Sequence, residues 1–389
     1  MILFTMVMVA SARTKRAAEA VPVFAFKVEM AENSPPVLAL QHLSLKFSKD
    51  PGAPNLVDDV SFSIARGETL CIVGESGCGK SVTSLALMGL LPSPPAHRVS
   101  GEAHFDGQDL FALDENALSD LRGNRLAMVF QEPMTSLNPA YTVGEQITEA
   151  ILRHRPMSRA AAKILAVEML SRVRIPAPEA RMRVYPHELS GGMRQRIMIA
   201  IALANHPALL IADEPTTALD VTIQAQVLLL IKTLQRETGT AMLLITHDLG
   251  VVAEVADTVA VMYAGRIVEY GPVAAIFDDP QHPYTIGLMG AIPSIGRREG
   301  GLTTIRGTVP APENLPEGCR FAPRCPFVEQ RCVDQKPPTV FVSGPDDGLT
   351  SGLKERLGTQ HSVACWRAPI DALAPFYLDD VRERNDAAI

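Results

Sequence analysis

Hydrophobic residues along the chain recur in short unbroken runs that are separated by longer segments of helical composition. Three of these runs are typical of buried strands, at 69–73, 208–212 and 241–245. The segment 160–170 is instead rich in good helix formers and has no strand character. Buried strands that alternate with helices predict a parallel α/β sheet. Because open α/β sheets bind ligands at the carboxyl ends of their strands, we expect the polar residues after these runs to share one site.

The pattern changes on either side of this α/β part. Short alternating apolar runs between Val37 and Ile64 predict an antiparallel β subdomain. A helical subdomain is expected within about 132–190. After Gly271 the long periodic runs stop and Pro, Gly and Cys become frequent, which indicates a small Cys-rich C-terminal region. The predicted division is a leader, a central domain and a C-terminal region, at 1–36, 37–271 and 272–389.

Charge and hydropathy narrow the possible partners. The chain of 389 residues has 36 Lys plus Arg against 43 Asp plus Glu, a net charge of -7 that disfavours nucleic acid as the main partner. No run reaches the ~18 apolar residues of a transmembrane helix, so we predict no membrane span. The apolar opening 1–10 precedes its positive charges, unlike a secretion signal. Two interpretations of 1–36 stay open, a disordered leader and a true start at Met30.

The segment 74–81, Gly-Glu-Ser-Gly-Cys-Gly-Lys-Ser, fits the phosphate-loop pattern G-x-x-x-x-G-K-[ST]. Backbone N–H groups of such a loop and the helix after it point at phosphate oxygens, and the lysine neutralises charge. The strand 69–73 and a predicted helix over 80–90 supply the required context, against the alternative of a plain Gly-rich turn. The predicted nucleotide contacts here are Gly74, Glu75, Ser76, Gly77, Cys78, Gly79, Lys80, Ser81 and Val82.

Phosphoryl transfer depends on Mg²⁺ and on charges placed around the transferred group. We expect Lys80 to contact the β- and γ-phosphates, and Ser81 and Asp213 to hold Mg²⁺ directly or through water. Glu214 is predicted to accept a proton from the attacking water, with a surface ion pair as the alternative role.

Two further polar residues are candidates because of their place in the chain. His247 follows the strand 241–245 and is predicted to contact the γ-phosphate and orient water. Gln131 is predicted to ligate Mg²⁺ and to respond to the state of the nucleotide. Taken alone, a histidine there is more often structural and an exposed glutamine means little, so the order of the motifs carries both predictions.

In that order, the motifs resemble those of ATP-binding-cassette ATPases over about 37–271. The matching segments are 74–81, Gln131, 189–195, 209–214, 218–220 and His247. The resemblance implies a P-loop NTPase cassette with a RecA-like parallel sheet, an antiparallel β subdomain and an inserted helical subdomain. It also implies that two cassettes enclose two ATP molecules.

The same resemblance assigns further nucleotide contacts. Each phosphate loop faces the partner's signature, which is Ser190, Gly191 and Gly192 in this chain, and Asp220 is carried over from the matching segment. Glycine amides and a serine hydroxyl at a helix N-terminus suit a γ-phosphate. Phe47 stands where the family usually has an adenine-stacking tyrosine, and ordinary core packing is its alternative role.

Four cysteines gather in the proline-rich C-terminal region. They are Cys319, Cys325, Cys332 and Cys365. Four thiolates suit a tetrahedral zinc ion or an iron–sulfur cluster, and the spacing lacks the C-x₂-C pairs of zinc ribbons. We predict a [4Fe-4S] cluster, while zinc, disulfides and free cysteines stay open as alternatives.

Segments 280–285, 318–326 and 132–139 resemble ATPases of dipeptide, oligopeptide and nickel importers. The resemblance implies a peripheral motor on the cytoplasmic face of the membrane that hydrolyses ATP to drive uptake of peptides or a related small solute. The implied partners are a second identical or related ATPase, two transmembrane permeases and an extracytoplasmic solute-binding protein, with no nucleic acid. Related proteins hold an iron–sulfur cluster on the four cysteines. A soluble cassette protein acting on DNA or ribosomes and a non-catalytic cassette are the competing hypotheses.

Overall fold

The computed structural model describes residues 35–50, 52–131, 136–216, 221–291, 305–342 and 361–370. Almost all of the predicted leader, including Met30, lies outside these residues. So do Asp220 and the segment 132–135 directly after Gln131.

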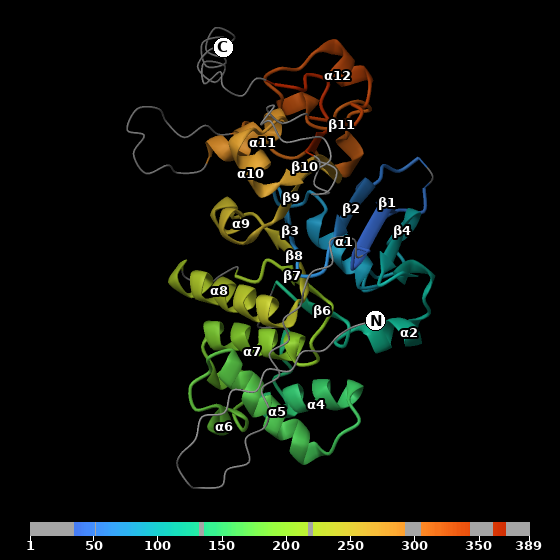
Figure 1. Ribbon diagram of the computed structural model, residues 1–389. Coiled ribbons are helices and arrows are strands. Elements are labelled where there is room, and N and C mark those ends of the chain that lie inside the picture. The colour runs from blue at the N-terminus through green and yellow to red at the C-terminus, as the bar shows by residue number, and fades with distance from the viewer. Residues whose placement is uncertain are drawn as a thin grey trace, which may run out of the picture. The chain divides into compact units, whose positions relative to one another are not determined.

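In the described part of the chain, the larger sheet has eight strands in the order β11-β12-β10-β9-β3-β8-β7-β6 (Figure 1). In that order the strands span Val340–Phe341, Ser362–Val363, Arg266–Pro272, Thr258–Tyr263, Thr69–Val73, Ala241–Thr246, Leu209–Asp213 and Leu126–Val129. The run from β9 to β6 is parallel, whereas β10, β12 and β11 pair antiparallel. The three predicted buried strands are therefore confirmed as β3, β7 and β8.

The smaller sheet is antiparallel, with the order β2-β1-β4-β5. Its strands span Val57–Ile64, Leu38–Lys46, His97–Phe105 and Gln108–Asp109 in that order. The pairing of β1 with β2 confirms the antiparallel prediction for 37–64. The sequence did not predict β4, since most of its residues are polar and only two of nine are buried.

Helices connect and cover the strands. The α-helices of the described residues are α1 (Lys80–Leu87), α2 (Glu115–Leu121), α4 (Val143–His154), α5 (Arg159–Arg172), α6 (Pro178–Arg181), α7 (Gly191–Leu203), α8 (Val221–Thr238), α9 (Leu249–Val255), α10 (Val273–Asp278), α11 (Pro283–Gly290) and α12 (Gln330–Asp334). The 3₁₀ turns are η1 (Leu110–Ala112), η2 (Pro186–Glu188), η3 (Pro312–Asn314) and η4 (Ala322–Arg324). In the described residues, no helix is long and apolar enough to cross a membrane.

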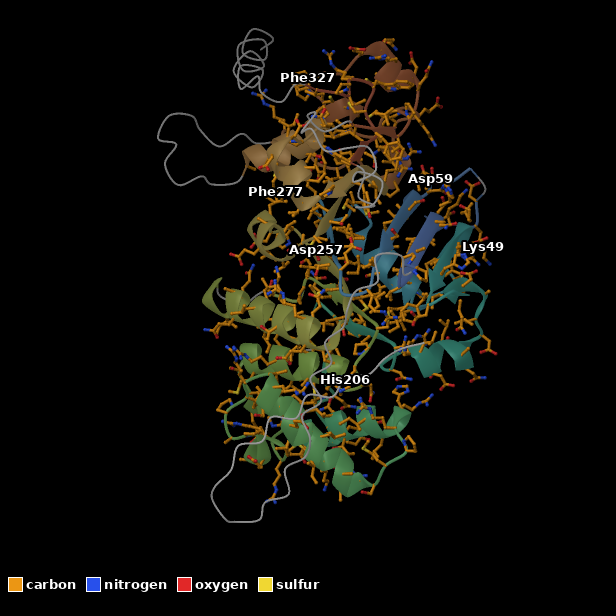
Figure 2. The ribbon with its side chains drawn as sticks, viewed as in Figure 1. Lys49, Asp59, His206, Asp257, Phe277 and Phe327 are labelled. Atoms are coloured by element: carbon orange, nitrogen blue, oxygen red, sulfur yellow. The ribbon has the colours of Figure 1, made fainter. Side chains whose placement is uncertain are left out.

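Alternation along the central strands divides the core between the two faces of the larger sheet. On β3, Cys71 and Val73 belong to the apolar cluster built with α4, α5, α7 and α8. Leu70 and Ile72 belong to the cluster built with the smaller sheet and α1. Both faces are covered, which explains why these strands read as continuous hydrophobic runs. Asp257, labelled in Figure 2, accepts a hydrogen bond from the Thr69 N–H at 2.8 Å and fixes the start of β3.

The C-terminal segment extends the larger sheet through a buried carboxylate. Glu269 on β10 is 1% exposed and accepts hydrogen bonds from the backbone N–H groups of Gln281 (2.6 Å) and His282 (2.9 Å). Nε2 of His361, next to β12, lies 2.7 Å from the same carboxylate. Glu269 thus joins three parts of the chain, which are β10, the turn before α11 and the residue before β12. Its buried side chain has three hydrogen-bonding partners.

A second buried carboxylate joins the smaller sheet to the C-terminal segment. Asp58 on β2 accepts hydrogen bonds from Asn55 Nδ2, Arg266 Nε and Arg320 Nη2, each at 2.9 Å. Burial alone would raise the pKa of Asp58, but the Asn55 bond and the two guanidinium groups outweigh it and lower the pKa from 3.8 to about 2.

We predict that Asp58→Asn lowers stability in a pH-dependent way. The folded pKa lies below the ordinary value of 3.8, so ionised Asp58 stabilises the fold above about pH 4, and this contribution disappears as pH falls to about 2. The shift corresponds to about 2 kcal/mol near neutrality. Thermal unfolding of wild type and variant between pH 2 and 8 measures this contribution to stability. A difference in Tm that is constant across this range would contradict the assignment.

Candidate active site

The ends of adjacent parallel strands bring the predicted residues to one edge of the larger sheet. Val73, the last residue of β3, pairs with Thr246 of β8, and Asp213 of β7 pairs with Ile245. The phosphate loop, Glu214 and His247 directly follow these three strand ends. The convergence expected from the hydrophobic runs is therefore present in the fold.

The phosphate loop wraps around the ammonium group of Lys80. Lys80 is 5% exposed, and its Nζ donates to the carbonyls of Gly74 (2.8 Å) and Glu75 (2.9 Å). Lys80 also opens α1, whose N-cap residue Gly79 makes no side-chain capping bond. The first N–H groups of α1 and a buried cation therefore adjoin the same loop, an arrangement that favours a bound anion.

Ser81 and Asp213 form the neighbouring polar pair. The Ser81 hydroxyl donates to Asp213 Oδ1 at 3.0 Å, although the two residues lie on α1 and β7. Burial raises the pKa of Asp213, and the hydrogen bond from Ser81 opposes that rise. A hydroxyl and a buried carboxylate beside a phosphate loop are the oxygen ligands that Mg²⁺ prefers.

Glu214 contacts both of the polar candidates predicted from the order of the motifs, Gln131 and His247. Its Oε2 accepts a hydrogen bond from Gln131 Nε2 at 3.0 Å, and its Oε1 lies 3.3 Å from His247 Nδ1. The Glu214 backbone has φ of 45°, in the left-handed region, and its N–H donates to Ile245 O at 2.9 Å. This carboxylate is contacted at both oxygens, and its residue lies in a strained turn.

The predicted signature begins α7. Ser190 is its N-cap, and its hydroxyl accepts a hydrogen bond from the Met193 N–H at 3.4 Å. Ser190 and Gly191 are exposed, while an added Cβ at Gly192 would come within 3.1 Å of Ile223. The exposed helix N-terminus is thus available to a second molecule.

The remaining loop and base-stacking candidates differ in exposure. Phe47 follows β1 and is 39% exposed, so it is not an ordinary core residue. Cys78 is fully buried, and burial raises the pKa of its thiol. Ser76 and Gly77 are exposed, and Val82 is half-buried. Asp220 lies outside the described residues.

The four C-terminal cysteines line one cavity of about 20 Å³, together with Phe321, Phe327 and Trp366 (Phe327 is labelled in Figure 2). Burial raises the pKa of Cys319 and Cys365, and of Cys325 to about 12. Within the described ranges, no three His, Cys, Asp or Glu side chains are grouped as a metal site. The described residues thus give no support to the predicted [4Fe-4S] site.

Two residues that the sequence did not identify as site residues contact the phosphate loop. Tyr284 Oη accepts a hydrogen bond from the Glu75 N–H at 2.9 Å, and Arg324 forms an ion pair with the Glu75 carboxylate at 2.8 Å. Both occur in segments that the sequence marked by resemblance alone. Their separations of 209 and 249 residues from Glu75 leave no local signal of contact.

A phosphate loop at the end of β3, with acidic, histidine and glutamine side chains at the neighbouring strand ends, defines a P-loop nucleotide-binding protein. The family "ABC transporter" matches residues 57–217, and "Oligopeptide/dipeptide transporter, C-terminal region" matches 268–332. The chain belongs to the ABC transporter family of ATP-binding subunits, and it carries this C-terminal region.

Named relatives and solved structures are consistent with that membership. The oligopeptide transport ATP-binding protein OppD of Bacillus subtilis is 53% identical over 308 residues, covering 79% of this chain and 86% of OppD. The dipeptide transport ATP-binding protein DppD of Bacillus subtilis is 54% identical, covering 75% and 87%. The ATP-binding cassette MJ0796, in a dimeric structure bound to ADP and Pi, is 27% identical with a TM-score of 0.54, covering 61% of this chain and 98% of that one.

We predict that Gly74→Ala disrupts the loop more than Gly77→Ala does. An added Cβ at Gly74 would lie 2.1 Å from the backbone oxygen of Met262, whereas the Cβ at Gly77 would meet nothing within 4 Å. Gly77 has φ of 82°, so its substitution carries backbone strain of about 1 kcal/mol without overlap. For Gly74→Ala we expect the free energy of unfolding to fall by about 3 kcal/mol, because the loop or β9 must shift to make room for the new methyl group. Urea unfolding compares the two variants, and equal losses would contradict the steric argument.

Proposed function

We propose that this chain is the ATP-binding and ATP-hydrolysing subunit of an importer for dipeptides, oligopeptides or a related small solute such as a nickel chelate. The names of OppD and DppD support peptides as the transported solute, as does the match of 268–332 to a peptide-transporter region. The observation that carries the ATPase is the contact of Glu214 with both Gln131 and His247 beside the phosphate loop.

In this proposal the loop residues bind the phosphates of ATP with Mg²⁺. Lys80 moves its hydrogen bonds from the Gly74 and Glu75 carbonyls to the β- and γ-phosphates. Ser81 and Asp213 would hold Mg²⁺ directly or through water, and Gln131 would ligate it; the bound ion would supply positive charge beside the transferred group. Glu214 accepts the proton of the attacking water, and His247 contacts the γ-phosphate and orients that water.

We further propose that two cassettes act together. The exposed Ser190 and Gly191 of one chain, with the half-buried Gly192, would close over the γ-phosphate on a partner ATPase, identical or related. Asp220 would complete the nucleotide contacts, and Phe47 would stack on adenine. The exposure of Phe47 and of the start of α7 supports these roles. Two transmembrane permeases and an extracytoplasmic solute-binding protein complete the proposed transporter, with this chain peripheral on the cytoplasmic face of the membrane.

For the C-terminal region we propose that Cys319, Cys325, Cys332 and Cys365 hold a [4Fe-4S] cluster. The support is their shared cavity and their chemistry, since four thiolates are the ligand set of this cluster. Burial is the largest cause of the raised pKa of Cys325, and the charges of Cys319, Cys365 and Cys332 add to it; a bound metal cation would oppose both effects. Zinc is the alternative occupant, and its ligands are the same four sulfur atoms.

The two competing hypotheses lack support from this chain. A cassette protein acting on nucleic acid is disfavoured by the net charge of -7 and by the transporter-type region at 268–332. A non-catalytic cassette is disfavoured by the Glu214 and His247 side chains, which lie in hydrogen-bond range of each other.

We predict that Glu214→Gln retains ATP binding and loses hydrolysis by at least about 100-fold, because glutamine keeps the size and one acceptor oxygen but cannot accept the proton. Mg²⁺-dependent phosphate release and ATP binding are measured on the same sample. Glu168→Gln is the matched control, since Glu168 is exposed and pairs with Arg172 on α5. Near-wild-type hydrolysis by Glu214→Gln would remove Glu214 from the base role.

We predict that anaerobically purified protein contains about four irons and four acid-labile sulfides per chain. Cys325→Ser should lose most of both, because a serine oxygen is a poor ligand for the cluster iron. Cys71→Ala is the control, since Cys71 is buried on β3 away from the cavity. Zinc in place of iron would assign the four thiols to a zinc site, and neither metal would leave them as free cysteines or disulfides.

A further inference from the structure

In the described residues, Glu75 joins the phosphate loop to the C-terminal region by hydrogen bonds and an ion pair. Its carboxylate forms a two-pronged ion pair with Arg324, with Nη1 to Oε1 at 2.8 Å and Nη2 to Oε2 at 3.1 Å. Its backbone N–H donates to Tyr284 Oη at 2.9 Å. Such parallel guanidinium–carboxylate bonds fix direction as well as distance.

Both partners of Glu75 are rigidly held. The Arg324 side chain is 6% exposed, lies over the ring of Tyr263 at 5.7 Å and donates to its hydroxyl at 3.3 Å. Tyr284 is fully buried, and its ring is 4.7 Å from that of Tyr263 and 5.4 Å from that of Phe321. Low exposure and packed rings mean that neither group can follow a displaced loop without moving its surroundings.

The same cluster reaches the cysteine cavity. Phe321 lines that cavity with Cys319 and Cys325, and its ring is 5.1 Å from that of Tyr263. Arg324 directly precedes Cys325 in the turn η4. The geometry of the four-cysteine region therefore sets the positions of the groups that hold Glu75.

Glu75 in turn holds the lysine of the loop. The Glu75 carbonyl accepts one of the two carbonyl hydrogen bonds of Lys80 Nζ, at 2.9 Å. The Glu75 carbonyl also accepts the Cys78 N–H at 3.3 Å, which closes the loop on itself. A shift of Glu75 thus changes the starting position of the cation that the proposed function places on the phosphates.

We propose that Arg324 and Tyr284 are positioning residues for the phosphate loop, so that the affinity for nucleotide depends on the C-terminal region of the same chain. This inference rests on the proposed binding of ATP at the loop. In this proposal each residue acts through its contact with Glu75. The segments 280–285 and 318–326, which marked the subfamily in the sequence, thereby gain a physical role at the active site.

A purely structural role is the competing explanation, because Arg324 also donates to the carbonyls of Arg306 (2.8 Å) and Gly307 (3.1 Å). A double-mutant cycle separates the two. The full chain is purified anaerobically as wild type, Glu75→Ala, Arg324→Ala and the double variant. The Kd for a non-hydrolysable ATP analogue with Mg²⁺ is measured by calorimetry, and circular dichroism reports folding.

We expect Arg324→Ala to weaken binding by about 10-fold, a size typical of coupling between sites. The double variant should bind no more weakly than the weaker single variant, because both changes break one contact. Arg324→Lys keeps the positive charge but cannot form both parallel hydrogen bonds to the Glu75 carboxylate, so it should bind more tightly than Arg324→Ala and more weakly than wild type. Tyr284→Phe should weaken binding while leaving the aromatic packing in place. Arg331→Ala is the matched control, since Arg331 pairs with Glu329 and stacks on Trp366 within the same region.

Three outcomes would overturn the inference. Wild-type affinity in folded Arg324→Ala would do so, as would additive losses in the double variant or an equal loss in Arg331→Ala. If Arg324→Ala fails to fold, the charge-reversed pair Glu75→Arg with Arg324→Glu decides the matter, and recovered folding without recovered affinity counts against the proposal. If wild type itself binds no nucleotide, the proposed function fails and this inference fails with it.

Discussion

The parallel pairing of β3, β8 and β7 is the constraint on which the site depends. Parallel strands end at the same edge, so residues that follow them are neighbours wherever they lie in the chain. Hydrophobic residues on both faces hold that register, since slipping one strand by a residue would exchange its two buried faces. Ser81 and Asp213 come within 3.0 Å for this reason, although 132 residues separate them.

The parts of the fold that could be predicted from the sequence are those with a local physical signal. Continuous apolar runs identify β3, β7 and β8, and the glycine and lysine spacing identifies the phosphate loop, because each pattern reflects a requirement satisfied within a few residues. The positions of Glu214 and His247 at the same sheet edge follow from their places directly after those strands. The strand β4 was missed because exposed polar residues dominate it, and a strand stabilised mainly by backbone pairing leaves a weak pattern.

Contacts of the C-terminal region had no such signal. The partners of Glu75 lie more than 200 residues away and occur in a loop-rich segment where periodicity is absent. From the composition of this region, the sequence singled out the four cysteines. The structure adds others, because the buried carboxylates of Asp58 and Glu269 also bind this region to the sheet. Long-range ion pairs between single residues cannot be read from one sequence without knowledge of the topology.

Two arginines, each adjacent to a cysteine of the cavity, form ion pairs with carboxylates of the cassette. Arg320, next to Cys319, pairs with Asp58. Arg324, next to Cys325, pairs with Glu75. This arrangement limits how the chain can be divided or recombined. A cassette cut free before residue 305 would leave Glu75 without Arg324 and Asp58 with Arg266 but not Arg320, so its behaviour would not represent that of the whole subunit. A C-terminal region transplanted from another protein would be compatible only if its arginines met acidic residues at positions 58 and 75, which makes these two pairs the units that must be exchanged together.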